Sequence, residues 1–180
     1  MESFNDIGLA ENTDKAALTD RGSHHYGDLY ELLFRTRRNH NILILEIGVL
    51  DGGSIRTWRK YFPKSHVIAI DISDRVKFDD PFVHFIHGDA YSEEVISRLS
   101  GGFDLMIDDG DHRVENQTIF LQRYSPLLKP GGILIIEDVI TRDGAKILKS
   151  NLPTGFSCAI VEMAEGNSIL DSRLFIAYRE

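Results

Sequence analysis

Three acidic residues and one histidine offer the clearest chemistry in this sequence. Asp109 and His112 lie in the acid-rich turn Asp108–His112, which ends one apolar run. Glu137 and Asp138 follow a second apolar run. Both runs resemble parallel strands, whose carboxyl ends meet at the ligand-binding edge of a sheet, so we expect these carboxylates to converge. Converging like charges raise one another's pKa unless a cation lies among them. Such hard oxygen ligands fit Mg²⁺, with Mn²⁺ as an alternative.

His112 lies on the same turn as Asp109, which places it within reach of whatever the cation holds. The alternative is that the acids are solvated loop residues that cap helices and that His112 merely begins a helix. Clustered carboxylates at the ligand edge of a sheet favour the metal site.

A second candidate site is the stretch Asn41–Trp58, which predicts a buried strand, a glycine-rich turn and a helix. Glu46 interrupts the apolar run near its end, where a carboxylate is costly unless a ligand or polar group meets it. Gly48 and Gly52 allow a tight turn, and Ser54 is a candidate helix cap. A cofactor is therefore expected against this loop; the alternative is an ordinary strand-to-helix turn.

The sequence motif of this loop distinguishes between a dinucleotide and other cofactors. A dinucleotide fingerprint requires G-x-G-x-x-G, and Leu50 stands where its middle glycine would be. The observed E-x-G-x-x-x-G resembles the first motif of the class I S-adenosylmethionine-dependent methyltransferases. Their ligand carries a positive sulfonium, which suits an acidic strand end.

Further acids follow the next two predicted strands. Asp71 lies 19 residues beyond Gly52, a spacing at which a carboxylate accepts hydrogen bonds from ribose hydroxyls in nucleoside-binding α/β folds. The alternative is that Asp71 caps the following segment, and the two roles are compatible. Asp89, followed by Ala90, is a candidate partner for an adenine amino group.

Alternating strands and helices must position these residues. Strands are expected at residues 42–47, 67–71, 82–87, 103–108 and 133–136, and helices at 26–34, 54–62, 92–99, 113–128 and 143–149. This alternation predicts an α/β fold with a doubly wound parallel sheet. Two last strands, at about 157–163 and 173–178 and joined by a polar turn, predict an antiparallel hairpin.

The bulk properties set limits on the class of protein. The 180 residues suit one domain, and the net charge of −8 disfavours a nucleic-acid partner. The sequence has no apolar run of membrane-spanning length and no signal peptide, so we expect a cytoplasmic protein. Cys158 is the only cysteine, which excludes an intrachain disulfide.

The N-terminal region shows weaker patterns. Residues 1–12 are expected to form a mobile arm ahead of a single domain at 13–180. Within that domain, residues 13–38 are expected to act as a helical lid over the cofactor or as a homo-oligomer contact.

Six motifs together resemble the metal-dependent sugar O-methyltransferases, which include macrolide and rhamnosyl O-methyltransferases. The motifs are T-D-K (13–15), H-x-Y-x-x-x-Y (24–30), L-E-I-G-V-x-x-G-G-S (45–54), W-x-x-Y-F-P (58–63), D-D-G-x-H (108–112) and P-G-G-x-x-x-x-E-D (130–138). The most specific part is the D-D-G-x-H turn together with the E-D pair.

The resemblance implies a fold, a reaction and a site. The fold is a seven-stranded, mostly parallel, Rossmann-like sheet of order 3-2-1-4-5-7-6 with an antiparallel last strand. The reaction is methyl transfer from S-adenosylmethionine to a sugar hydroxyl, rhamnose-like, on a glycan or a glycosylated natural product. Asp109, Glu137 and Asp138 bind Mg²⁺, and His112 acts as general base beside Asp109. The residues expected to hold S-adenosylmethionine are Lys15, Glu46, Gly48, Gly52, Ser54, Asp71, Asp89, Ala90 and Asp108.

Two features depart from the family pattern: relatives often have Ser at the position of Asp111, and some carry an auxiliary domain. Alternative functions are O-methylation of a catechol-like small molecule, which needs the same acids and cation, and a non-catalytic S-adenosylmethionine-binding module. An NAD-dependent dehydrogenase is disfavoured by the missing middle glycine.

Overall fold

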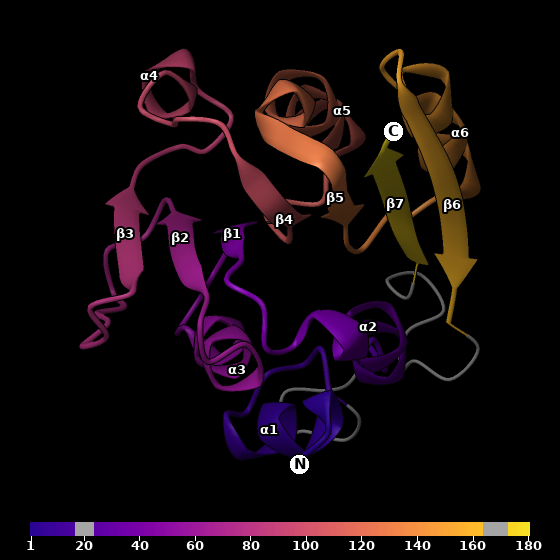
Figure 1. The fold of residues 1–180 in the computed structure, drawn as a ribbon. Coiled ribbons are helices and arrows are strands. Elements are labelled where there is room, and N and C mark those ends of the chain that lie inside the picture. Colours follow the sequence, from indigo (N-terminus) through magenta and orange to yellow (C-terminus); the bar gives the residue numbers. More distant parts are fainter. Residues whose placement is uncertain (17–23, 164–172) are drawn as a thin grey trace.

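The computed structural model describes residues 1–16, 24–163 and 173–180. A seven-stranded sheet forms the middle layer of this described part (Figure 1). Its strands are β1 (Leu43–Ile47), β2 (His66–Asp71), β3 (Val83–His87), β4 (Phe103–Asp108), β5 (Leu128–Ile136), β6 (Phe156–Glu162) and β7 (Arg173–Arg179). Their order across the sheet, β3-β2-β1-β4-β5-β7-β6, confirms the predicted topology.

The strand register brings the carboxyl ends of the central strands to one edge. β1 pairs in parallel with β2 and β4, and β4 pairs in parallel with β5. Ile47 is opposite both Ile70 and Asp108, and Asp108 is opposite Ile136. The residues that follow these strands therefore share one rim. β7 runs antiparallel to β5 and to β6, as the predicted final hairpin requires.

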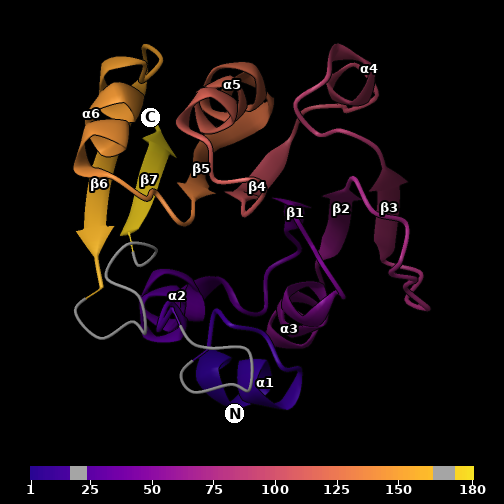
Figure 2. The same cartoon turned by 180° about the vertical axis from the view of Figure 1, so that it is seen from behind.

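Helices cover both faces of the sheet. α1 (Phe4–Ala10), α2 (Gly27–Phe34) and α3 (Gly53–Tyr61) lie on one face, and α4 (Glu93–Ile96), α5 (Val114–Tyr124) and α6 (Arg142–Ser150) lie on the other (Figures 1 and 2). Side-chain caps begin two of the helices on the second face: the Ser92 hydroxyl accepts a hydrogen bond from the Val95 N–H, and the Thr141 hydroxyl accepts one from the Gly144 N–H. These caps satisfy backbone donors that a helix leaves free in its first turn.

The alternation of side chains along β1 divides the core into two clusters. Ile44 packs with Trp58 and the other aromatic residues beneath α1–α3, whereas Leu45 packs with Phe120 beneath α4–α6. Since successive strand residues point to opposite faces, Glu46 points to the same face as Ile44. This alternation directs the Glu46 carboxylate toward α3 and away from the open edge of the sheet.

Two predicted boundaries were wrong around Pro126. The helix expected at 113–128 ends at Tyr124 and continues as a 3₁₀ turn, Ser125–Leu127, and β5 begins at Leu128, ahead of the expected start at 133. Proline lacks the backbone N–H and its ring clashes with the preceding turn, which ends the α-helix. The helix expected at 92–99 is also shorter, at Glu93–Ile96.

The N-terminal residues are packed, so the prediction of a mobile arm at 1–12 was wrong. α1 begins with a capping box in which Ser3 and Asp6 exchange hydrogen bonds. Phe4 is fully buried, and its ring centroid lies 4.8 Å from that of Trp58 and 5.2 Å from that of Tyr30. Spaced apolar residues in a seven-residue helix are too few to give a clear periodicity, which is why the sequence did not reveal this contact.

The expected lid or oligomer segment, 13–38, contains α2 and the 3₁₀ turn Arg35–Arg37, and its role stays a prediction. Residues 17–23 of this segment, and the polar turn predicted between the last two strands, lie outside the described residues. Among the described helices, none has the length and apolar character needed to cross a membrane.

Candidate active site

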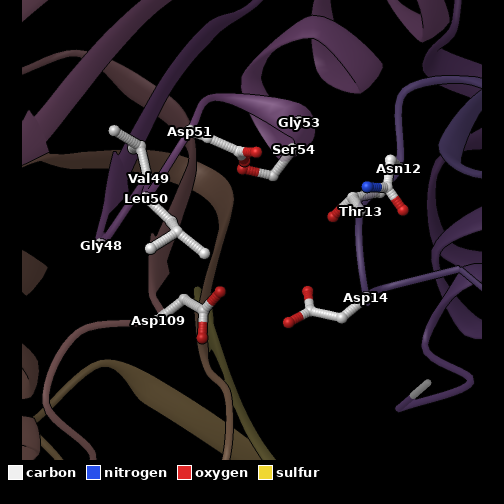
Figure 3. Close-up of a pocket in the computed structure, with 10 residues that line it drawn as sticks. All are labelled: Asn12, Thr13, Asp14, Gly48, Val49, Leu50, Asp51, Gly53, Ser54 and Asp109. Atoms are coloured by element: carbon white, nitrogen blue, oxygen red, sulfur yellow. The ribbon is translucent and has the colours of Figure 1, made fainter. Parts of the chain in front are cut away.

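Three cavities border the rim formed by the ends of β1, β2, β4 and β5. The first lies between the β1–α3 loop and residues 12–14, and the carboxylates of Asp14 and Asp109 face each other across it (Figure 3). The second has a volume of about 450 Å³, and the third about 260 Å³. Gly48 lines all three, so the β1–α3 loop is their common wall.

The backbone of this loop requires glycine. Gly48 has φ +78°, and a Cβ placed on it would lie 1.9 Å from the carbonyl oxygen of Asp109. Gly52 has φ +80° and precedes the first residue of α3. Ser54, which the sequence suggested as the cap, lies inside the first turn of α3 and lines the first cavity. The close approach of the β1–α3 loop to the turn at Asp109 therefore depends on a residue without a side chain.

Asp71 holds the same loop through hydrogen bonds to its backbone. Its Oδ2 accepts hydrogen bonds from the backbone N–H groups of Val49 (2.8 Å) and Leu50 (3.0 Å), and its Oδ1 accepts one from Ser73 (2.8 Å). The capping role left open by the sequence is thus present. Asp71 also lines the second and third cavities, so its carboxylate remains accessible to a ligand there, and ribose binding stays a prediction.

The third cavity holds the residues expected to meet an adenine ring. Asp89, Ala90 and Tyr91 line it, and Asp89 Oδ1 accepts a hydrogen bond from the Tyr91 N–H. Behind them, buried Asp108 accepts hydrogen bonds at Oδ1 from the Tyr91 hydroxyl (2.7 Å) and the Gly110 N–H (3.2 Å). Burial raises the pKa of Asp108 to about 7, although both donors oppose this shift. Its Oδ2 has no hydrogen-bond partner among the described residues, which fits a ligand donor nearby.

Asp109, His112 and Asp138 come together beside the second cavity. One potential ligand atom from each lies within 4.8 Å of the other two, and His112 Nδ1 is 3.8 Å from Asp138 Oδ2. That Nδ1 atom is buried and has no hydrogen-bond partner in the described part of the chain. Two carboxylates and an imidazole can hold a divalent cation, so the donor set fits the predicted metal.

His24 and Tyr26 approach the same carboxylate from the N-terminal segment. The Tyr26 hydroxyl donates to Asp138 Oδ1 (2.6 Å), and His24 Nδ1 lies 3.5 Å from that oxygen. Burial and the nearby Asp109 raise the pKa of Asp138. Neither His24 nor Tyr26 was among the site residues predicted from the sequence. The H-x-Y spacing was the available signal, since it places both rings at the start of α2.

Lys15 lies among the acidic side chains of the site. It is fully buried, and its Nζ lies 2.6 Å from Asp109 Oδ2, 2.6 Å from Glu137 Oε2 and 3.7 Å from Glu46 Oε1. Burial acts to lower the pKa of Lys15, but the carboxylates outweigh it and raise this pKa above its ordinary value. Lys15 lines none of the three cavities, and its ammonium contacts the acids; cofactor binding by Lys15 stays a prediction.

Glu46 and Glu137 are turned toward the interior. The Trp58 Nε1–H donates to Glu46 Oε2, and Glu46 lines none of the three cavities, so its contact with the cofactor stays a prediction. The Tyr30 hydroxyl donates to Glu137 Oε1, while Lys15 holds Oε2. Burial raises the pKa of Glu137 against the attraction of Lys15. Of the three predicted metal ligands, the structure groups Asp109 and Asp138 with His112 and engages Glu137 elsewhere.

Asp111, the position that departs from the family pattern, stays at the surface of the turn. Its Oδ2 accepts hydrogen bonds from the Arg113 Nε–H (2.7 Å) and from the Asn116 amide (2.6 Å). These contacts attach the turn to the start of α5, so the acid has a local structural role.

The sequence matches a family model described as a methyltransferase domain over residues 45–139. The chain is 34% identical over 128 residues to the mycinamicin VI 2''-O-methyltransferase of Micromonospora griseorubida, a match that covers 66% of this chain and 32% of the relative. It is 31% identical over 144 residues to the demethylmacrocin O-methyltransferase of Streptomyces fradiae, covering 74% and 36%. The chain thus spans about a third of the length of these curated relatives.

Solved structures share the fold. The MycE methyltransferase of mycinamycin biosynthesis, in complex with Mg, SAH and mycinamycin VI, matches with a TM-score of 0.70 at 30% identity, covering 76% of this chain and 39% of that one. A putative caffeoyl-CoA O-methyltransferase from Staphylococcus aureus matches at 19% identity with a TM-score of 0.63, covering 100% and 93%. The second match supports the fold alone.

Proposed function

We propose, from the premise that this chain belongs to the methyltransferase domain family, that it transfers a methyl group from S-adenosylmethionine to a sugar hydroxyl with the help of a divalent cation. The observation that carries this proposal is the grouping of Asp109, His112 and Asp138 beside cavities that share the β1–α3 loop. The β1–α3 loop, together with Asp71 and Asp89, lines the space proposed for a nucleoside. Asp109, His112 and Asp138 lie beside that space, where an acceptor would approach the bound nucleoside.

The chemistry required is alignment and proton removal. Methyl transfer from a sulfonium is an in-line displacement with an activated donor, so the acceptor oxygen must be aligned and deprotonated. Asp109 and Asp138 would hold the cation; Glu137 would join them as the third ligand only by giving up one of its contacts with Lys15 and Tyr30. When bound there, Mg²⁺ supplies a charge that lowers the pKa of a nearby hydroxyl. His112 then takes the proton as general base.

Relatives and the local surface support a sugar acceptor. One relative is named for the 2'-hydroxyl of a rhamnosyl tetracenomycin, at 32% identity. Leu50 and Ile140, both exposed, flank the second cavity and offer aliphatic surface beside the polar site. This aliphatic surface beside the second cavity suits a sugar that carries an apolar group. A cytoplasmic location and homo-oligomerisation remain predictions of the sequence.

The test is methyl transfer by the purified chain, before and after chelation. We expect transfer from S-adenosylmethionine to a rhamnoside, its loss after EDTA treatment, and its recovery with Mg²⁺ or Mn²⁺. A catechol serves as the competing acceptor, since it needs the same cation. Activity that is indifferent to chelation contradicts the metal role, and preference for the catechol contradicts the sugar acceptor.

A further inference from the structure

Lys15 is a buried charge that the proposed reaction does not use. Its ammonium lies between Asp109 and Glu137, each at 2.6 Å, with Glu46 at 3.7 Å. The three acids come from the ends of β4, β5 and β1, so one side chain contacts three neighbouring strands. An ionised group in such a place is stable only when it is paired, and here each acid also needs the lysine.

Among the described residues, Glu46 and Glu137 also accept hydrogen bonds from uncharged groups. Glu46 accepts from the Trp58 indole, and Glu137 accepts from the Tyr30 hydroxyl. Asp138, directly after Glu137, accepts from the Tyr26 hydroxyl. Lys15 is therefore the buried permanent cation among four acidic side chains in the described part of the site.

We propose that Lys15 is a positioning residue of the metal site: its ammonium holds Asp109 and Glu137 together in the absence of the divalent ion and opposes binding of that ion by charge repulsion. This inference rests on the proposed function, because it takes Asp109 and Asp138 as metal ligands. It assigns the T-D-K segment an electrostatic role. Thr13 and Asp14 of that segment line the first cavity, so Lys15 also joins the cavity wall to the acids.

A thermodynamic cycle between Lys15 and the metal tests the proposal. The variant Lys15→Met keeps an unbranched side chain of similar length, shorter by one heavy atom, and removes the charge. Without metal its melting temperature should fall, because the acids lose their cation, and Mg²⁺ should raise it by more than it raises the wild type. Calorimetric titration with Mg²⁺ should give a dissociation constant about tenfold lower or more, as expected when a like charge within a few ångströms is removed.

Arg59→Met is the matched control. Arg59 is a largely buried cation on α3, paired with Asp80 at 2.9 Å and bonded to the Ser65 carbonyl, and neither partner belongs to the site. Its loss should lower the melting temperature equally with and without Mg²⁺ and leave the dissociation constant unchanged. The same pattern in Lys15→Met would mean a packing role only and would overturn the proposal.

A double variant covers the case in which Lys15→Met does not fold. Lys15→Met combined with Glu137→Gln removes one charge of each sign, so it should recover folding without metal, whereas lost packing would not be recovered. If the wild type binds no divalent ion, the metal-dependent function fails; recovery by the double variant would then still support Lys15 as the cation that holds the acids together. If the wild type binds Mg²⁺ but the double variant does not recover folding, the proposed role of Lys15 is contradicted and the metal-dependent function is not.

Discussion

His112 and Asp138 hold backbone conformations that L-residues seldom adopt. Their φ values are +59° and +50°, and the two side chains approach within 3.8 Å. Such conformations cost roughly 1–3 kcal/mol each and concentrate at functional sites. Both His112 and Asp138 line the second cavity, where the proposed removal of a proton from an acceptor would take place.

The first prediction concerns His112. Because a positioned general base contributes roughly 10²–10⁴-fold, His112→Ala should lower turnover by about that factor. Calorimetry should show unchanged binding of S-adenosylmethionine, since His112 is not among the residues expected to hold the cofactor.

His84→Ala is the control, because His84 is an exposed residue on β3 away from the site, and it should keep full activity. Near-wild-type turnover in His112→Ala would remove His112 from the role of base. Loss of turnover in His24→Ala alone would transfer that role to the ring beside Asp138 Oδ1.

At the scale of elements, the β1–α3 loop and the β4–α5 turn behave as one unit. The Gly48 N–H donates to Ile70 O (2.9 Å), the Asp109 N–H donates to Ile47 O (3.0 Å), and Gly48 faces the Asp109 carbonyl. The proposed cofactor loop and a proposed metal ligand are thus in direct backbone contact. A change in either turn should affect both binding sites.

Gly48→Ala tests this coupling. The added Cβ would clash with the Asp109 carbonyl at 1.9 Å, so the two turns must separate. We expect affinity for S-adenosylhomocysteine to fall about tenfold or more, equivalent to about 1.4 kcal/mol or more, together with weaker Mg²⁺ binding by calorimetry.

Gly131→Ala separates the clash from backbone strain. Gly131 has a similar φ of +74°, and nothing lies within 4 Å of an added Cβ. It should cost only the left-handed strain of about 1–2 kcal/mol in stability and leave both affinities unchanged. Equal binding losses in the two variants would show that strain, and not contact between the turns, is responsible.

At the scale of the whole molecule, the N-terminal segment completes the layer of helices on which the site rests. Phe4 contacts the rings of Tyr30, Trp58 and Tyr61, and the Phe4 N–H donates to Glu31 (2.9 Å). Tyr30 and Trp58 in turn hold Glu137 and Glu46. The packing of α1 therefore extends to the acids of the site through two aromatic residues.

Phe4→Ala should accordingly destabilise the protein. Removal of a fully buried phenylalanine costs about 3–5 kcal/mol, measured by urea unfolding. Leu9→Ala on the same helix, where Leu9 is 44% exposed, should change stability by about 0.5 kcal/mol or less. A negligible effect of Phe4→Ala would restore the view of residues 1–12 as a mobile arm.

The sequence by itself determined the alternation of strands and helices and the identity of the acidic turns, whereas the strand order was implied by the resemblance to the methyltransferase family. The alternation and the acidic turns follow from local patterns: apolar runs, glycines at a tight turn, and acids at strand ends, which share one rim in a parallel sheet. For that reason the sequence could predict that Asp109, Glu137 and Asp138 converge with His112 nearby; the structure brings Asp109, His112 and Asp138 together.

Only the tertiary structure decided which partner each charged group takes. Lys15 contacts acids 94 and 122 residues away, and Glu46 faces inward because of its alternation along β1. Burial and long-range pairing depend on how the helical layers close over the sheet. No local pattern records that closure, so the placement of Lys15 and Phe4 was beyond the sequence.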